Sequence, residues 1–121
     1  MAIINIRIIH KIRDFYAAAA HEKHEAIQHY IHAYNALGDD FVVANLDALT
    51  AVEEEMVASM REEEKKLQII DSYIAIRNQP PTTWGMLRKI SAERSEEIKK
   101  QFSSILEECL ERCPKIFKEE V

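Results

Sequence analysis

Glycine and proline are scarce in this chain, with 2 glycines and 3 prolines among 121 residues. These residue types supply most turn conformations, so their scarcity leaves few turns and favours long, uninterrupted helices. Two glycines also cannot form a glycine-rich phosphate-binding loop. The length is typical of one domain, and we expect residues 1–121 to form a single helical domain.

Membrane-directed segments are missing from the sequence as well. No apolar run approaches the roughly 18 residues that cross a bilayer, and Arg7, Lys11 and Arg13 interrupt what could otherwise be the apolar part of a signal peptide. Acidic residues outnumber basic ones by 21 to 16, for a formal net charge of −5. This balance disfavours nucleic-acid binding, which needs a basic stripe. We expect a cytoplasmic protein without membrane insertion, whose partners are proteins.

The only two cysteines are Cys109 and Cys113. On one helix, residues four apart face the same way, but their β-carbons lie too far apart for an unstrained disulfide. We therefore expect two buried free thiols. No histidine stands near them in the sequence, and a cysteine on an apolar stripe is usually a core residue. We expect no enzymatic activity and no cofactor.

Residues 3–37 contain neither glycine nor proline and read as one amphipathic helix. Gly38 follows as its natural stop, and Asp39 or Asp40 is expected to cap the next element. At 100° per residue the apolar positions of this helix gather on one side. They are Ile8, Ile12, Phe15, Tyr16, Ala19, Ala26, Ile27, Tyr30, Tyr34 and Leu37.

A second helix is predicted over residues 40–77, antiparallel to the first because the connection is so short. Glu63 occupies a position in the middle of its apolar stripe, and we expect this part of the seam to be wet and poorly packed. By spacing, Glu62 pairs with Lys66 on a solvated surface. The stripe consists of Val42, Leu49, Val52, Met56, Met60, Leu67, Ile70 and Ile74.

Pro80 and Pro81 end this helix, and a short third helix is predicted over 83–90. A final helix over 92–113 carries apolar residues three or four apart, and Pro114 should kink or end it and leave a frayed tail over 117–121. The fold class is therefore all-α: a long antiparallel helical hairpin, coiled-coil-like, with a short third helix and a C-terminal helix.

The five histidines all fall on the polar side of the first helix. Bundle helices can hold zinc or a di-iron centre with imidazole and carboxylate ligands, and the nearest candidates are His21, Glu25, His29 and His32. The di-iron pattern, however, needs histidine three residues after glutamate, whereas His29 follows Glu25 by four. We expect a water-facing surface here, and a metal-binding bundle is the weaker alternative.

Three stretches carry a family resemblance: Asn45–Glu55 with the charged run 61–66, Thr83–Ile90, and Ser95–Phe102. Over roughly residues 45–113 the chain resembles flagellar export chaperones of the FlgN type, or a related type III secretion chaperone. The resemblance implies a cytosolic protein that keeps its client unaggregated before secretion, gripping it with the C-terminal helices. The positions that it implies for client binding are Trp84, Leu87, Ile90, Ile98, Phe102, Ile105 and Cys109.

Two interpretations of the last third of the chain stay open. Trp84, Leu87 and Ile90 can fold back as a lid on the hairpin, or they can form, with the final helix, a groove for a partner's helix. The leading hypothesis is a protein-binding chaperone that holds a helical client segment. The alternative is a structural hairpin that self-associates as a homodimer or four-helix bundle and so covers its apolar stripes.

Overall fold

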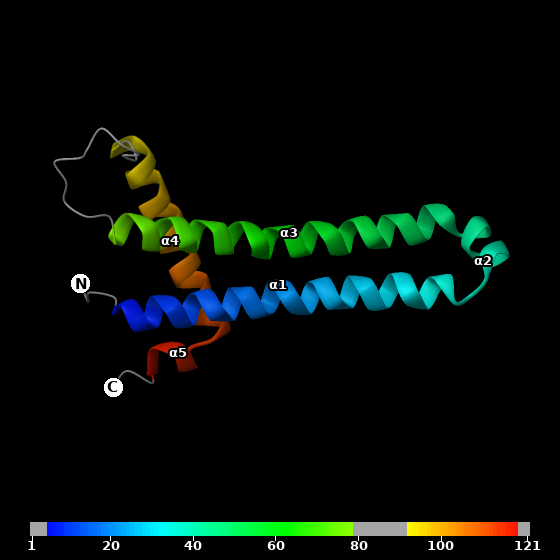
Figure 1. Ribbon diagram of the computed structural model, residues 1–121, viewed down its shortest axis with the longest axis horizontal. Coiled ribbons are helices and arrows are strands. Elements are labelled where there is room, and N and C mark those ends of the chain that lie inside the picture. The colour runs from blue at the N-terminus through cyan, green and yellow to red at the C-terminus, as the bar shows by residue number, and fades with distance from the viewer. Residues whose placement is uncertain (1–4, 79–91, 119–121) are drawn as a thin grey trace. The chain divides into compact units, whose positions relative to one another are not determined.

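The computed structural model describes residues 5–78 and 92–118, and 92% of them are helical. No strand occurs within these two ranges, so the all-α class with a long helical hairpin is confirmed. The helix expected over 83–90, with Trp84, Leu87 and Ile90, lies outside the described residues. The elements in Figure 1 are α1 (Ile6–Asn35), α2 (Asp39–Ala44), α3 (Leu46–Arg77), α4 (Ala92–Arg112) and α5 (Lys115–Lys118).

The chain divides into two compact units, and both long helices contribute to each of them. One unit is made of residues 1–15 and 66–121 and contains the start of α1, the end of α3, α4 and the one-turn helix α5. We call it the three-helix unit after α1, α3 and α4. The unit Tyr16–Lys65, here called the hairpin unit, contains the rest of α1 and α3 with α2 between them. That the two fold together as one domain stays a prediction.

α1 ends at Asn35, earlier than the predicted residue 37, and the turn that follows it leads to Gly38. Leu37 N–H donates to the Tyr34 carbonyl at 3.1 Å, and Gly38 then adopts a φ of +98° and a ψ of 153°, a backbone region open essentially to glycine. Asp39 and Asp40 are not the predicted caps: both lie in the first turn of α2, and no side chain caps that helix. Their carboxylates still favour the positive end of the helix dipole.

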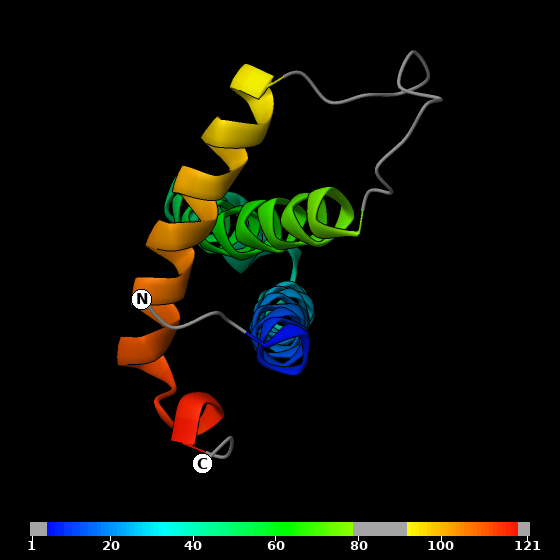
Figure 2. The same cartoon turned by 90° about the vertical axis from the view of Figure 1, so that its left-hand side faces the viewer.

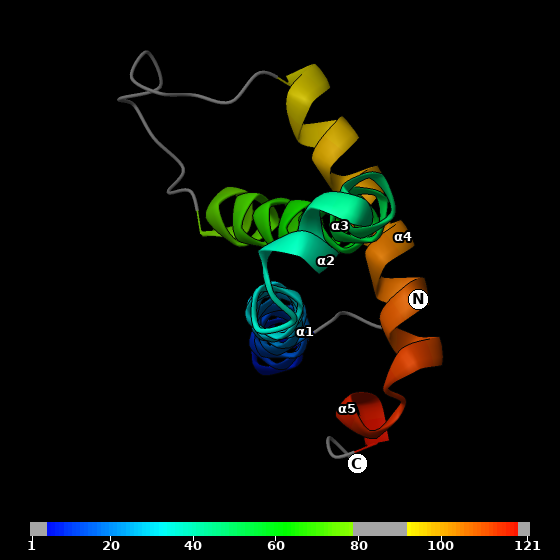
Figure 3. The same cartoon turned by 90° about the vertical axis from the view of Figure 1, so that its right-hand side faces the viewer.

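A break at Asn45 separates α2 from α3 (Figure 3), so the continuous helix predicted over 40–77 is wrong. The backbone there departs from helical values, with a φ of −117° and a ψ of 17°. The Asn45 side-chain amide donates to the Phe41 carbonyl at 2.9 Å. Asparagine competes in this way for backbone groups and interrupts helices.

The C-terminal end follows the proline prediction in part. α4 ends at Arg112, before Pro114, as expected from the missing N–H. The frayed tail predicted over 117–121 is wrong for Phe117 and Lys118. Their backbone N–H groups donate to the Pro114 carbonyl at 3.1 and 3.3 Å, and both residues belong to α5. Ile116 anchors this turn, since its side chain is buried.

Burial differs sharply between the two units. Among its described residues, the three-helix unit buries eight apolar side chains: Ile9, Ile12, Ile70, Ile98, Phe102, Ile105, Cys109 and Ile116. The hairpin unit buries only Tyr16, Ala20, Ile27 and Glu63. Residues 28–62 are all described, and none of them is buried. The three-helix unit therefore contains a hydrophobic core, whereas most of the hairpin unit has none of its own.

Candidate protein-interaction site

The predicted client-binding residues of the last helix lie in the core of the three-helix unit. Ile98, Phe102, Ile105 and Cys109 are at most 5% exposed. Phe102 stacks on Tyr73 of α3, with ring centroids 4.0 Å apart and planes 2° from parallel. Figure 2 shows α4 crossing the end of α3. The spacing of three and four predicted the right face of α4, and that face packs within the chain.

Charged groups at the rim reinforce this packing. Lys66 of α3 donates to both carboxylate oxygens of Glu108 on α4, at 2.8 and 2.9 Å. The spacing predicted a pair between Lys66 and Glu62 on the same helix, whereas these bonds connect Lys66 to a different helix. Arg112 contacts the same carboxylate at 3.4 Å and lies over the Phe15 ring, 5.1 Å from its centroid. These contacts join α4 to both long helices.

The two thiols are free but differ in environment. Cys109 is fully buried, and burial raises the pKa of its thiol to about 11. The prediction that both are buried is wrong for Cys113, which is only half-buried next to Pro114, where α4 has ended. A protonated, buried thiol is a poor nucleophile, so Cys109 acts as a core residue.

The seam of the hairpin unit contains a buried charge in place of the expected wet gap. Glu63 is 1% exposed, and Lys23 of α1 brings its ammonium group to 3.8 Å from the carboxylate. Burying a carboxylate costs hydration free energy, and charged or polar partners have to compensate for that cost. The expectation of a water-filled seam at Glu63 is therefore wrong.

Two tyrosines of α1 extend the polar seam toward α2. Tyr30 donates its hydroxyl to the Leu49 carbonyl at 3.1 Å, and Tyr34 donates to Glu53 at 2.8 Å. This hydrogen bond and the nearby carboxylate raise the pKa of Tyr34. The rings meet edge to face, with centroids 5.3 Å apart. Hydrogen bonds, more than apolar burial, join α1 to α3 in this part of the hairpin unit.

Large apolar side chains are left in solvent on the hairpin unit. We call this set the exposed apolar surface, although Phe41 and Val43 lie on different sides of α2 because residues two apart on a helix point about 200° apart. Its members are Leu37 (58% exposed), Phe41 (45%), Val43 (73%), Leu46 (53%) and Val52 (43%). Leu37 and Val52 were predicted on interior stripes, and the structure corrects both. Sequence reasoning missed the surface as a site, although adjacent apolar residues at 41–43 cannot all face one core.

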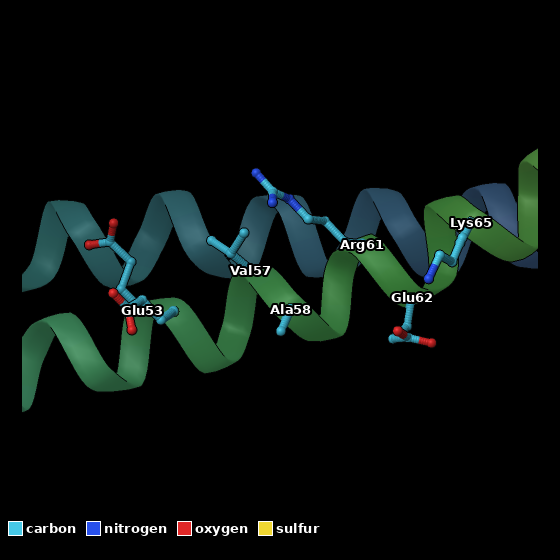
Figure 4. A pocket seen from close by; sticks show the side chains of 7 residues that line it. Glu53, Val57, Ala58, Arg61, Glu62 and Lys65 are labelled. Atoms are coloured by element: carbon cyan, nitrogen blue, oxygen red, sulfur yellow. The ribbon is translucent and has the colours of Figure 1, made fainter.

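An open depression of about 560 Å³ runs along α3 in the same unit. Figure 4 shows its lining side chains, all of which come from α3. Val57 and Ala58 lie between Glu53 and Glu54 at one end and Arg61, Glu62 and Lys65 at the other. A trough along a single helix does not enclose a small molecule, but it can accommodate side chains of another helix.

The histidines point to water, as predicted. His10, His21, His24, His29 and His32 are all exposed, and His21 contacts only Glu25 among the metal candidates, at 3.1 Å. Across residues 5–78 and 92–118, no three histidine, cysteine or carboxylate side chains gather as a metal site would require. His29 and His32 therefore do not join His21 and Glu25 in a common ligand set.

Comparison with protein-family models, characterised proteins and solved structures finds no match. In the part of the chain that the structure describes, none of the helices has the length and apolarity needed to cross a membrane.

Proposed function

We propose that this protein is a non-enzymatic binding protein that holds a helical segment of a partner, in the manner of a cytosolic export chaperone. One observation carries the proposal: no side chain of residues 28–62 is buried, and five large apolar side chains within this range are exposed. A concentration of exposed large apolar side chains within residues 37–52 favours an interaction site there. A partner that covers it provides the core that this part of the hairpin unit lacks.

α4 supports the choice of a helix as the partner. In the three-helix unit, the same two long helices accept α4 through apolar residues at spacings of three and four, which are buried. Amphipathic helices bind other helices in this way in many complexes, with anchors one turn apart. The long helices therefore already have the shape that receives a helix along part of their length.

The client grip implied by the family resemblance is a different proposal for the same function. Because Phe102 stacks on Tyr73, client binding through α4 requires α4 to leave the long helices first. Binding to the exposed apolar surface needs no such rearrangement. We therefore place the client on the hairpin unit and treat the α4 route as an outcome of the test.

The test uses the full chain as bait in its native host. Val43→Lys with Leu46→Lys places two charges on the exposed apolar surface, and Ser103→Lys with Ser104→Lys adds the same charge at exposed positions of α4. A specific protein partner recovered with the wild type and the α4 control, but lost with the hairpin variant, supports the proposal. Loss with the α4 control alone assigns the client to α4.

Self-association is the second candidate, because a second copy can cover the same surface in a four-helix arrangement. Sedimentation velocity over micromolar concentrations distinguishes the two. A monomer throughout removes this candidate. A concentration-dependent dimer that the Val43→Lys, Leu46→Lys variant dissociates replaces the chaperone proposal.

A further inference from the structure

Charge is distributed unevenly along the chain. The hairpin unit holds eleven acidic and three basic side chains, a formal charge of −8, whereas the whole chain carries −5. The remaining residues therefore carry +3. Within the hairpin unit, residues 24–60 contain seven carboxylates and no lysine or arginine. The acidity of the protein is concentrated in the unit that lacks a core.

Six of these seven carboxylates are close in sequence to the exposed apolar side chains. Asp39 and Asp40 precede Phe41, and Asp47 follows Leu46. Glu53, Glu54 and Glu55 follow Val52, and of these three only Glu53 is half-buried, through its bond with Tyr34. The segment 39–55 thus carries exposed apolar side chains and carboxylates, and it contains no lysine or arginine.

We infer that the exposed apolar surface binds a basic amphipathic helix of another protein, one with apolar anchors at intervals of three and four flanked by lysine and arginine. The inference rests on the proposed function and adds the chemistry of the client. Apolar anchors replace the missing core, and the flanking cations meet the carboxylates. Complementary charge also speeds encounter and selects among partners.

The same charge argues against a second copy as the occupant. Two hairpin units facing each other with these surfaces would bring together −8 and −8, and like charges across an interface are costly. An acidic or neutral helix can use the apolar contacts but gains nothing from the carboxylates. The surface is therefore selective for sign of charge as well as for helical shape.

Two designed peptides test this chemistry with the full-length protein. Both carry leucine at the same anchor positions; one has lysine at every flanking position, and its twin has glutamate. By fluorescence anisotropy at about 20 mM salt, the lysine peptide should bind at least about tenfold more tightly than its twin. The difference should shrink several-fold at about 300 mM salt, where screening weakens attraction between exposed charges.

Charge-reversed variants identify the surface. Glu54→Lys with Glu55→Lys changes two exposed carboxylates on α3, and Glu107→Lys with Glu111→Lys makes the same change in net charge at exposed positions of α4. The first variant should lose most of the preference for the lysine peptide, and the second should keep it. If both variants behave alike, the inferred surface is wrong.

The outcomes separate this inference from the proposed function. If the two peptides bind within about threefold of each other, and Val43→Lys with Leu46→Lys abolishes both, the helix-holding function stands and the basic client is wrong. If neither peptide binds and the native host yields no partner that depends on the hairpin unit, both proposals fall.

Discussion

Truncation of one aromatic ring tests whether α4 is docked in solution as the structure has it. Phe102 is 3% exposed and stacks on Tyr73 of α3 with ring centroids 4.0 Å apart. Phe102→Ala removes that ring from the core of the three-helix unit. It leaves the helix propensity of α4 intact, because alanine is the best helix former.

The expected loss follows from burial. Replacing a buried phenylalanine by alanine costs about 3–5 kcal/mol, the sum of lost transfer free energy and the cavity left behind. A domain of this size unfolds with roughly 5–15 kcal/mol, so the variant should lose a large share of its stability. The aromatic pair itself contributes about 0.5–1.5 kcal/mol of this.

Urea unfolding followed by circular dichroism measures the change. Ser103→Ala is the matched control, since its side chain is exposed on the neighbouring position of the same helix, and it should shift the free energy of unfolding by no more than about 0.5 kcal/mol. A double-mutant cycle with Tyr73→Leu isolates the stacking contribution.

A free α4 gives a different result. Phe102 would then be solvent-exposed, and its removal would change the free energy of unfolding by less than about 1 kcal/mol, with no coupling to Tyr73. That outcome would refute the packing described here. It would also make the buried face of α4 available for a client, and so favour the α4 route.

Three further predictions concern one or two positions each. Cys113 should react with a thiol reagent at pH 8 well before Cys109, whose folded-state pKa is raised to about 11. The stability that the protonated Cys109 thiol contributes is complete below the unfolded-state pKa near 9. Urea unfolding at a series of pH values should show that this contribution is lost as the pH rises through 11. Gly38→Ala should cost about 1–3 kcal/mol although no atom lies near a new β-carbon, since the φ of +98° is the obstacle; an unchanged urea midpoint would contradict this. Replacing both partners, Glu63→Leu with Lys23→Leu, should leave the free energy of unfolding unchanged or raise it by about 1–4 kcal/mol. Lys23→Ala alone, which weakens compensation of a buried charge, should lower it; equal losses in the two proteins would show that the pair stabilises the fold as a unit.

The sequence predicted which segments are helical better than it predicted which of their side chains are buried. Helix type, the glycine in the turn after α1 and the end of α4 before Pro114 follow from local chemistry and are confirmed, although α1 ends at Asn35, before the predicted residue 37. The inward face of α4 was predicted as well, because apolar spacing fixes one face of a helix. The break at Asn45 was missed, since asparagine is tolerated in a helix until its side chain bonds the backbone.

The candidate site was harder to predict, because periodicity gives a helix face without saying what covers it. Leu37 and Val52 satisfy the apolar spacing as well as Ile70 does, yet only Ile70 is buried, where α4 is present. Glu63 shows the converse: its polarity predicted water, but a lysine on another helix compensates its charge. Both outcomes depend on contacts distant in sequence, which a single-helix pattern does not contain.

The two units are stabilised by different kinds of contact. Eight buried apolar side chains stabilise the three-helix unit, and the hairpin unit relies on a buried ion pair and tyrosine hydrogen bonds while exposing apolar and acidic side chains. Hydrogen bonds and a buried ion pair contribute little net free energy compared with apolar burial, because loss of hydration offsets much of their gain. A ligand that binds only the folded hairpin unit stabilises it by mass action, to an extent set by the concentration and affinity of the ligand. This uneven distribution of stabilising contacts is the physical reason to look for the partner on the hairpin.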